Sequence, residues 1–411
     1  MRAVVIGSGI AGPATALALE EVGVSSVVLE AHPRPDGDVG SYLAVSPNGL
    51  SALAALDVLD AVKAVGQPTS GSVILGATGR VLGRPSFGRP LDDGTPALTL
   101  KRSRLAAVLG EAAAARGVEL RYGARVASLR RTATGTVVTL ESGEDLEADL
   151  VVGADGVHSV VRRHLDPLAP AARYVGLTNF GGIAHTPDLA ATLEPGAWTF
   201  VFGRRAFSGL VPTPAGDVIW FVNLPRPAIT PEERAATTQE QWREVLVEAL
   251  SGDAGCGAEV VARGEFELAA DNTHDLGHVP VWHDGSAVVI GDAGHAPAPS
   301  SGQGASMALE DAVALAVAVR DAPTLPEALT SYEVARRPRV ERIVAVGARS
   351  SSAKVPGRLA RPLLEAVMRL VFRTVASDAR QEWMSGYRVT WDAPEPAAEP
   401  ARVIGGRGGG A

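Results

Sequence analysis

The chain has 411 residues, a formal net charge of −8 at pH 7 and a single cysteine, Cys256. The acidic balance argues against a nucleic-acid partner, because no basic stripe is present to neutralise phosphates. One cysteine excludes an internal disulfide and offers no metal cluster, and we expect Cys256 to be a small buried apolar residue. The length favours two domains. No run suits a membrane span, and glycines and Pro13 interrupt the apolar N-terminus, so we expect no targeting segment and a cytoplasmic protein.

The segment from Val4 to Glu30 sets a glycine-rich turn between an apolar strand and a helix, and it ends in a carboxylate. Gly7 permits the tight turn, Gly9 lets the backbone approach a pyrophosphate, and Gly12 lets the helix pack on the strand. The free N–H groups of that helix then face the phosphates. Glu30 ends a second strand and is placed to accept hydrogen bonds from a ribose 2′-hydroxyl. The pattern predicts a dinucleotide site that suits FAD or NAD better than NADP.

Two later segments repeat the design of a strand followed by an acid. In residues 150–162 an apolar strand runs into Asp155-Gly156, and in residues 287–311 a strand runs into Gly291-Asp292 before a Pro/Ser/Gly loop and a helix. Three such strand ends are more than an NAD site needs. They suit a long flavin dinucleotide that lies extended across the sheet.

The GSGIAG turn with Glu30, the GADGVHSVVR segment and the GDAGHAPAPSSGQG segment together resemble the single-component FAD-dependent aromatic hydroxylases. That group includes 4-hydroxybenzoate and salicylate hydroxylases, epoxidases and tetracycline-modifying monooxygenases, and the resemblance covers residues 1 to about 345. It implies that the ADP half of FAD is bound by Gly7, Gly9, Ile10, Ala11, Gly12 and Glu30. It also implies that Asp292 holds the ribityl chain, and we expect Asp155 to belong to the same cofactor site. The flavin ring would be lined by Gly302, Gln303, Gly304 and Ala305, whose backbone N–H groups stabilise the negative charge that the ring gains on reduction.

Two further matches leave alternatives open. Arg102 occupies the place of the family's arginine at the start of a helix, where it reaches the flavin chain or the pyrophosphate, but its neighbour Arg104 is a second candidate. Val126 matches a position whose backbone brackets the adenine, and it could equally be a core residue. Ala31 stands where many relatives carry Arg, so a side-chain contact to the adenine would have to come from Arg34.

The resemblance implies that the cofactor carries the chemistry. NADH or NADPH reduces FAD, the reduced flavin adds O2 at C4a, and the resulting hydroperoxide transfers an oxygen atom to an electron-rich carbon by hydroxylation or epoxidation. No acid–base side chain is expected to be catalytic. Pro299 aligns with a proline beside the reacting edge of the flavin, where its rigid ring would fix the loop. We expect His295 to stabilise that loop rather than to act as a base.

The alternation of strand and helix patterns predicts an α/β fold: a Rossmann-like FAD-binding domain with an inserted antiparallel β-sheet substrate domain and C-terminal helices. We expect the FAD-binding domain in three parts, 1–70, 98–172 and 284–345, and the substrate domain in two, 71–97 and 173–283. A helical region over 346–391 and a disordered tail over 392–411 follow. Residues 48–65 suit one amphipathic helix. The basic amphipathic stretch 358–375 is expected to pack on the body of the enzyme, with membrane-surface contact as the alternative.

Aromatic residues concentrate in the predicted substrate domain. Alternation places Trp198, Phe200 and Phe202 on one face of a strand, and Trp220 and Phe221 on opposite faces of another. Each could be a core residue, but as a group they suggest an apolar, aromatic or polycyclic small-molecule substrate, in aromatic catabolism or secondary metabolism.

Three other functions share parts of this pattern. A flavin-dependent halogenase would carry a WxWxIP segment, and the sequence has none. A flavin-dependent reductase of an isoprenoid-like substrate would share the first glycine turn, and a non-catalytic FAD-binding redox module would share all three motifs. Oxygen uptake with a nicotinamide donor separates a monooxygenase from such a module. The sequence leaves open the substrate, the oligomeric state, and the choices between NADH and NADPH and between hydroxylation and epoxidation.

Overall fold

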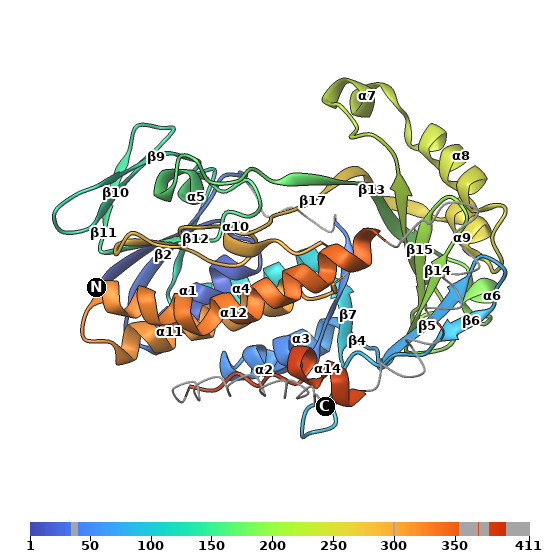
Figure 1. Cartoon of the computed structure of the whole chain (residues 1–411), viewed down its shortest axis with the longest axis horizontal. Helices are drawn as coiled ribbons and strands as arrows, with labels where there is room; N and C mark the ends of the chain where they lie inside the picture. Colours follow the sequence, from blue (N-terminus) through green and yellow to red (C-terminus); the bar gives the residue numbers. More distant parts are fainter. Residues whose placement is uncertain (34–39, 299–300, 353–368, 370–377, 392–411) are drawn as a thin grey trace, which may run out of the picture.

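The computed structural model describes residues 1–33, 40–298, 301–352, 369 and 378–391. Figure 1 shows two lobes side by side, joined by the long strands β13 (Arg173–Ala184) and β17 (Glu265–Asp275). Pro299, Arg34, the tail 392–411 and all of the stretch 358–375 except Arg369 lie outside the described residues. None of the described helices combines the length and the apolar character that crossing a membrane requires.

The first lobe is built on a five-stranded parallel sheet. Its strands, in spatial order, are β18 (Ala287–Val289), β12 (Leu150–Gly153), β1 (Arg2–Ile6), β2 (Ser25–Glu30) and β8 (Glu119–Tyr122). The chain moves from β1 to β2 on one side and reaches β12 on the other, so the sheet has a switch point between β1 and β12. In α/β folds of this kind, ligands bind where neighbouring connections leave in opposite directions.

Helices and a small sheet cover the two faces of this parallel sheet. On one face lie α1 (Ala11–Glu21), α4 (Arg102–Ala115), α11 (Gly304–Asp321) and α12 (Leu325–Ser352), as Figure 1 shows. On the other lie α5 (Val160–Leu165), α10 (Asp292–His295) and the antiparallel strands β9 (Val126–Arg131), β10 (Thr136–Leu140) and β11 (Asp145–Ala148). Because both faces are covered, the inner strands β12 and β18 are apolar along their whole length, and Val4, Val5 and Val28 are completely buried.

The second lobe is a seven-stranded sheet that combines strands from residues 71–97 and 173–283. Its order is β17, β13, β16 (Val218–Pro225), β15 (Phe207–Pro212), β14 (Ala197–Phe202), β5 (Gly71–Gly76) and β6 (Val81–Gly83). Neighbours are antiparallel except β14 and β5, which are parallel. The expected inserted sheet is therefore confirmed, with one parallel pair that the β pattern did not predict.

Helices that the sequence analysis did not expect lie on this second lobe. They are α6 (Pro187–Ala190), α7 (Pro231–Ala236), α8 (Gln239–Leu250) and α9 (Gly257–Arg263). The signal for α8 was present in the sequence, because Thr238 and Gln241 form a capping box and Trp242, Leu246 and Leu250 are buried at helical spacing. These side chains pack with Trp220 and Phe180 from the sheet in a second hydrophobic core.

A third sheet lies between the lobes and leads into two short helices. It consists of β3 (Tyr42–Val45), β7 (Leu98–Lys101) and β4 (Gln67–Pro68), and the chain forms α2 (Pro47–Ala55) and α3 (Leu59–Val65) between β3 and β4. The single helix expected over residues 48–65 is wrong. The chain turns between α2 and α3, where Asp57 has a φ of +55°, a left-handed value that ends the first helix. The last described helix, α14 (Asp378–Ser385), packs beside α2.

Candidate functional site

The three predicted strand ends meet at one edge of the parallel sheet. The N–H of Ala154, after β12, donates to the carbonyl of Ile6 in β1 (2.9 Å), and the N–H of Ile290, after β18, donates to the carbonyl of Gly153 (3.0 Å). The turn at Gly7, the Asp155 turn and the Gly291-Asp292 turn therefore follow adjacent parallel strands. This edge carries the switch point between β1 and β12, which is where a dinucleotide is expected.

The glycines of the first turn meet three different geometric demands. Gly7 has a φ of +105°, which disfavours any side chain. A Cβ on Gly12 would lie 1.8 Å from the carbonyl oxygen of Gly7, so α1 packs directly on the turn. A Cβ on Gly9 would meet no atom within 4 Å. Gly9 thus borders open space, and α1 begins after Ile10 without a side-chain cap, so its first N–H groups are available to a phosphate. The turn fits a pyrophosphate.

Glu30 connects this turn to the end of β2. Its carboxylate accepts the N–H of Ser8 (2.8 Å) on one oxygen and the N–H of His32 (2.9 Å) on the other. Each carboxylate oxygen can accept a second hydrogen bond, so these contacts orient Glu30 and leave it able to bind ribose hydroxyls.

Asp155 has a structural role in the protein itself. Its carboxylate accepts the N–H groups of Val160 (2.6 Å) and Val161 (3.2 Å) at the start of α5. Burial raises the pKa of Asp155, against the effect of these bonds and of Ser159. Its contribution to a cofactor site stays a prediction.

The third turn brings Asp292 beside the Gly302–Ala305 loop. A Cβ on Gly304 would lie 3.8 Å from the Asp292 carboxylate, and Gly302 has a φ of +61°. α10 begins at Asp292, and its N-cap is Gly291, so Asp292 is not the capping residue of this helix. The side chain of Gln303 is buried and turned toward Ser46 and Asn48 rather than toward the strand ends. Gln303 can therefore offer only its backbone to a flavin ring.

The remaining predicted residues are placed as follows. Arg102 is the first residue of α4 and is exposed, as is Arg104, so the structure favours neither of them for the flavin chain. The side chain of Val126 packs in the core at the start of β9, which leaves only its backbone for the adenine. Ile10 and Ala11 also pack in this core. His295 is buried and lies 2.5 Å from Asp311, within a network of charges inside the protein.

Sequence reasoning missed the buried polar residues that hold the loop. Asn48 is completely buried, and its amide donates to Gln303 (2.9 Å) and to Glu310 (2.6 Å). A polar amide in the first turn of an otherwise apolar helix was the available signal. Its partners lie more than 250 positions away in the sequence, at separations of 255 and 262, so the pattern did not predict the contact.

The side of the seven-stranded sheet that faces the first lobe carries aromatic side chains in register. One row across the strands is Asn179, Asn223, Phe207 and Phe202, and the next is Gly181, Phe221, Gly209 and Phe200. Trp198 continues this face and stacks on Phe200 (5.7 Å between centroids, 13° between planes). A Cβ on Gly209 would lie 2.2 Å from the Phe221 ring, so glycine is needed there for that ring to lie against the sheet.

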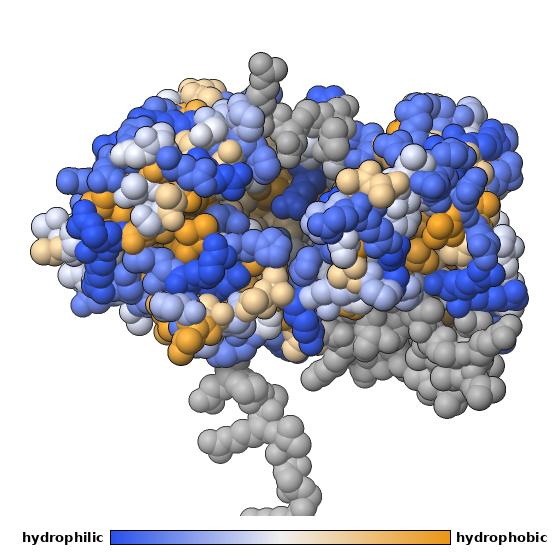
Figure 2. Space-filling view, turned by 90° about the horizontal axis from the view of Figure 1, so that it is seen from above, coloured by the Kyte–Doolittle hydropathy of each residue, from blue (hydrophilic) through white to orange (hydrophobic). Residues whose placement is uncertain are grey.

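This aromatic face is directed toward the third sheet, between the lobes. Tyr42 of β3 packs against it, and the same strand leads to Ser46, whose hydroxyl accepts a hydrogen bond from Gln303 (3.0 Å). Phe200, Phe202 and Phe221 are only partly buried although they lie on an inner face. Figure 2 shows that the surface is hollowed between the two lobes. The aromatic face is thus turned toward the third sheet and the first lobe, where Trp198 donates to the hydroxyl of Thr99 (2.9 Å).

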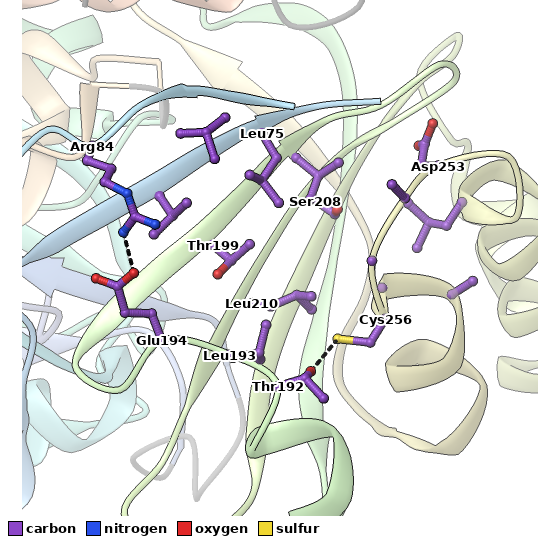
Figure 3. Close-up of a pocket in the computed structure, with 18 residues that line it drawn as sticks. Leu75, Arg84, Thr192, Leu193, Glu194, Thr199, Ser208, Leu210, Asp253 and Cys256 are labelled. Carbon is purple, nitrogen blue, oxygen red and sulfur yellow. Dashed lines mark hydrogen bonds and ion pairs between the residues drawn. The ribbon is translucent and has the colours of Figure 1, made fainter. Parts of the chain in front are cut away.

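A separate cavity of about 360 Å³ lies on the opposite face of this sheet (Figure 3). Thr199 and Val201 line it, and they alternate along β14 with the aromatic residues of the inner face. Cys256 also lines it, half-buried rather than fully buried, and its sulfur accepts a hydrogen bond from Thr192 (3.9 Å). Burial raises the pKa of this thiol. The sheet separates this cavity from the strand ends.

Comparison with known proteins settles the family. A family described as FAD binding domain matches residues 1–346. The aurachin C monooxygenase/isomerase of Stigmatella aurantiaca is 30% identical over 347 residues, which cover 84% of this chain and 87% of that protein. The chain belongs to this FAD-binding family. An FAD-dependent urate hydroxylase of Klebsiella pneumoniae is 29% identical over 348 residues (84% and 88%).

The solved structures agree with the family. The R204Q variant of HpxO from Klebsiella pneumoniae, complexed with FAD, has a TM-score of 0.80 and 26% identity, and the match covers 94% of this chain and 99% of that one. The expected fold class and the resemblance to FAD-dependent hydroxylases are thereby confirmed. FAD is the cofactor of this chain, and the chain is an FAD-dependent oxygenase.

A first prediction concerns Asp292 in this flavoprotein. If Asp292 binds the ribityl hydroxyls, Asp292→Ala should weaken FAD binding by about 1.5–3 kcal/mol, because a charged acceptor is lost. The apoprotein should keep its melting temperature, because the N-cap of α10 is Gly291 and not Asp292. Titration of the apoprotein with FAD and its thermal unfolding measure the two effects. A lower apoprotein melting temperature with unchanged FAD affinity would assign Asp292 to the fold.

Proposed function

We propose that this protein is a monooxygenase that uses NADH or NADPH and O2 to hydroxylate or epoxidise an apolar aromatic or polycyclic small molecule. The observation that carries the proposal is the in-register aromatic face formed by Trp198, Phe200, Phe207 and Phe221, which is turned toward the first lobe and is partly open. When bound, FAD reduced by the nicotinamide donor supplies the activation of O2 and the transfer of one oxygen atom.

The residues of the chain bind and shelter the reactants. We infer that the first glycine turn and the N-terminus of α1 hold the pyrophosphate, that Glu30 holds the ribose and that Asp292 holds the ribityl chain. The backbone of Gly302–Ala305 would then border the ring, where N–H groups stabilise negative charge. Stacked aromatic residues offer a substrate ring an apolar surface and exclude water from the reacting atoms.

The polar groups around this face support a substrate without a net charge. Lys101 lies between the lobes, over the ring of Tyr42, and its ammonium is 2.5 Å from the Glu267 carboxylate. This cation is thus neutralised by the protein and does not demand an anionic partner. At the far end of the face, the amide of Asn223 donates to Asn179 (2.9 Å). These two amides form a polar end for an otherwise apolar site.

The proposal predicts coupled oxygen transfer. Aromatic and polycyclic compounds should be screened for stimulated NAD(P)H oxidation, with urate included because the HpxO neighbour has been solved with uric acid. With a true substrate and ¹⁸O2, one labelled oxygen atom should enter the product, and the yield of hydrogen peroxide should fall because the reaction is sheltered. Label that enters from water instead, or reduction of a double bond without oxygen, would contradict monooxygenation.

A variant on the aromatic face tests whether the substrate binds there. Phe221→Ala removes the ring that lies over Gly209 and leaves the strand ends unchanged. It should raise the KM for the substrate while the FAD content stays that of the wild type. Unchanged KM would place the substrate elsewhere. A protein that binds FAD and takes up no oxygen with any compound would instead be a redox module.

A further inference from the structure

Four charged side chains cluster behind the Gly302–Ala305 loop, three of them buried and the fourth, that of Arg339, 12% exposed. Glu310 and Asp311, adjacent on α11, are completely buried, and Arg336 of α12 is 1% exposed. Arg336 binds both carboxylates (2.6 and 2.7 Å), and Arg339 binds Glu310 through two nitrogens (both 2.8 Å). The four formal charges cancel. Their burial removes two carboxylates and two guanidinium groups from water, which is costly.

One branch of this cluster reaches the loop that borders the flavin ring. Glu310 accepts a hydrogen bond from Asn48 (2.6 Å), and the same amide group donates to Gln303 (2.9 Å). Gln303 in turn donates to the hydroxyl of Ser46 (3.0 Å). The side chain of Gln303, the residue between Gly302 and Gly304, is therefore held on one side by Asn48, which Glu310 also binds, and on the other by Ser46.

The other branch reaches the last described part of the chain. Arg339 donates to the backbone carbonyls of Trp383 and Met384 (both 2.7 Å), and its guanidinium lies 4.3 Å from the centre of the Tyr387 ring. Beyond it, the N–H of Val389 donates to Ser51 (3.1 Å) and the indole of Trp391 donates to the carbonyl of Ala55 (2.9 Å). Residues 382–391 are thus attached both to α12 and to α2, the helix that begins beside Asn48. The match to the FAD binding domain ends at residue 346, so this segment lies beyond it.

Stability by itself does not explain such a cluster. Buried ion pairs often contribute no more than well-packed apolar residues would, whereas they impose one arrangement on the groups that surround them. Here the surrounding groups are the loop at Gln303 and the segment 382–391, which are linked by a continuous chain of contacts: Trp383 and Met384, Arg339, Glu310, Asn48, Gln303.

We propose that residues 382–391 position the backbone of Gly302–Ala305 for the flavin. This segment acts on the loop through Arg339, Glu310 and Asn48. This inference rests on the proposed position of the flavin ring beside that loop. The segment touches neither cofactor nor substrate. It fixes the side chain of Gln303, and the fixed side chain keeps the loop N–H groups aligned with the ring.

Arg339→Gln in the full-length protein tests this proposal. The variant loses the charge that joins Glu310 to Trp383 and Met384, so the loop should loosen. We expect the dissociation constant for FAD, measured by titration of the apoprotein, to rise about ten-fold, as one lost charged hydrogen bond would give. The midpoint potential of the bound flavin should fall, because misaligned N–H groups stabilise the reduced, negatively charged ring less well.

Arg337→Gln is the matched control. Arg337 lies two positions away on α12 and also binds carboxylates, Glu333 and Glu341, and two backbone carbonyls, those of Val279 and Pro280, but none of these contacts leads to Gln303. Its substitution should leave the FAD affinity and the potential at wild-type values. Ser46→Ala is the second variant, in case Arg339→Gln does not fold. It removes only the acceptor for Gln303, and it should lower the potential in the same direction.

Opposite results would overturn the proposal. If Arg339→Gln and Ser46→Ala lower only the melting temperature, and FAD affinity and potential match those of Arg337→Gln, the cluster is structural alone. The same holds if the double variant Arg339→Gln/Ser46→Ala shows strictly additive effects, because both substitutions loosen the same side chain, Gln303, and should therefore couple. Failure of the proposed function looks different: wild-type protein would bind FAD and transfer no oxygen, and the comparison of these variants would still stand.

Discussion

Gly12→Ala is expected to abolish FAD binding and to destabilise the fold by about 3 kcal/mol or more, the upper range for overpacking a buried site. The added Cβ would lie 1.8 Å from the carbonyl oxygen of Gly7 and 3.0 Å from its carbonyl carbon. Both contacts are backbone atoms, so no flexible side chain can move aside. The turn and the start of α1 must separate, and both the pyrophosphate site and the packing of α1 on β1 are lost. Urea unfolding and FAD titration measure the two losses.

Gly9→Ala is the matched control, because the same methyl group is added three residues earlier. At Gly9 it meets no protein atom within 4 Å, so the apoprotein should keep its stability within about 0.5 kcal/mol. The methyl group would instead occupy the space beside Gly9 that the pyrophosphate of FAD would fill. FAD affinity should therefore still fall at least about ten-fold. Normal FAD binding by Gly9→Ala would show that the cofactor does not cross this turn.

Asp311→Asn is expected to cost about 3–5 kcal/mol of unfolding free energy at pH 7, as removal of one partner from a buried ion pair does. Asp311 accepts the N–H of Gly291 (2.9 Å) and binds His295 and Arg336. Asparagine preserves its shape but leaves Arg336 with less negative charge around it. Asp321→Asn, at the end of the same helix, is the control, because its partner Arg320 is exposed and such pairs contribute about 0–1 kcal/mol.

The effect of Asp311→Asn should shrink in acid. Burial by itself raises the pKa of Asp311, but His295 and Arg336 outweigh it and hold this pKa at about 2, below the ordinary value of 3.8. A lowered carboxyl pKa contributes stability that is complete above the unfolded-state value and is lost as the pH falls toward the folded-state value. The wild type should therefore lose this contribution between about pH 4 and pH 2. Unfolding curves for the wild type and for Asp311→Asn at pH 7 and pH 3 measure this effect, and the difference in their free energies of unfolding should be smaller at pH 3. An equal difference at both pH values would contradict the low pKa of Asp311.

The first glycine turn could be predicted because its constraints are local. Gly7, Gly9 and Gly12 lie within six residues, and the requirements of a tight turn and a close helix approach depend on neighbouring backbone atoms. The strand that carries Glu30 follows after one helix, so period and spacing also placed this carboxylate beside the turn. The aromatic alternation was equally local: Trp220 and Phe221 lie in different hydrophobic clusters on the two faces of the sheet, as period two requires.

The helices of the second lobe were not predicted from the sequence pattern. Because the residues on either side of 226–264 are rich in β-formers, strands were expected over the whole of 173–283. Thr238 and Gln241 nevertheless form a capping box, which is typical of a helix N-terminus. In the first lobe the apolar spacing of residues 48–65 was helical, but the break at Asp57 depends on how α3 must turn to pack on α4. Packing overrode a continuous helical pattern there.

The sequence by itself determined the cofactor class, the parallel sheet and the residues that end its strands, because each rests on periodicity and on backbone demands within a short segment. Only the tertiary structure decided what surrounds the site. The burial of Gln303 against Asn48, the charges of Glu310 and Arg339, and the attachment of residues 382–391 join segments that lie up to 338 positions apart. Such contacts leave no spacing in the sequence, since the free energy that selects them comes from the simultaneous desolvation and pairing of groups that meet only in the folded chain.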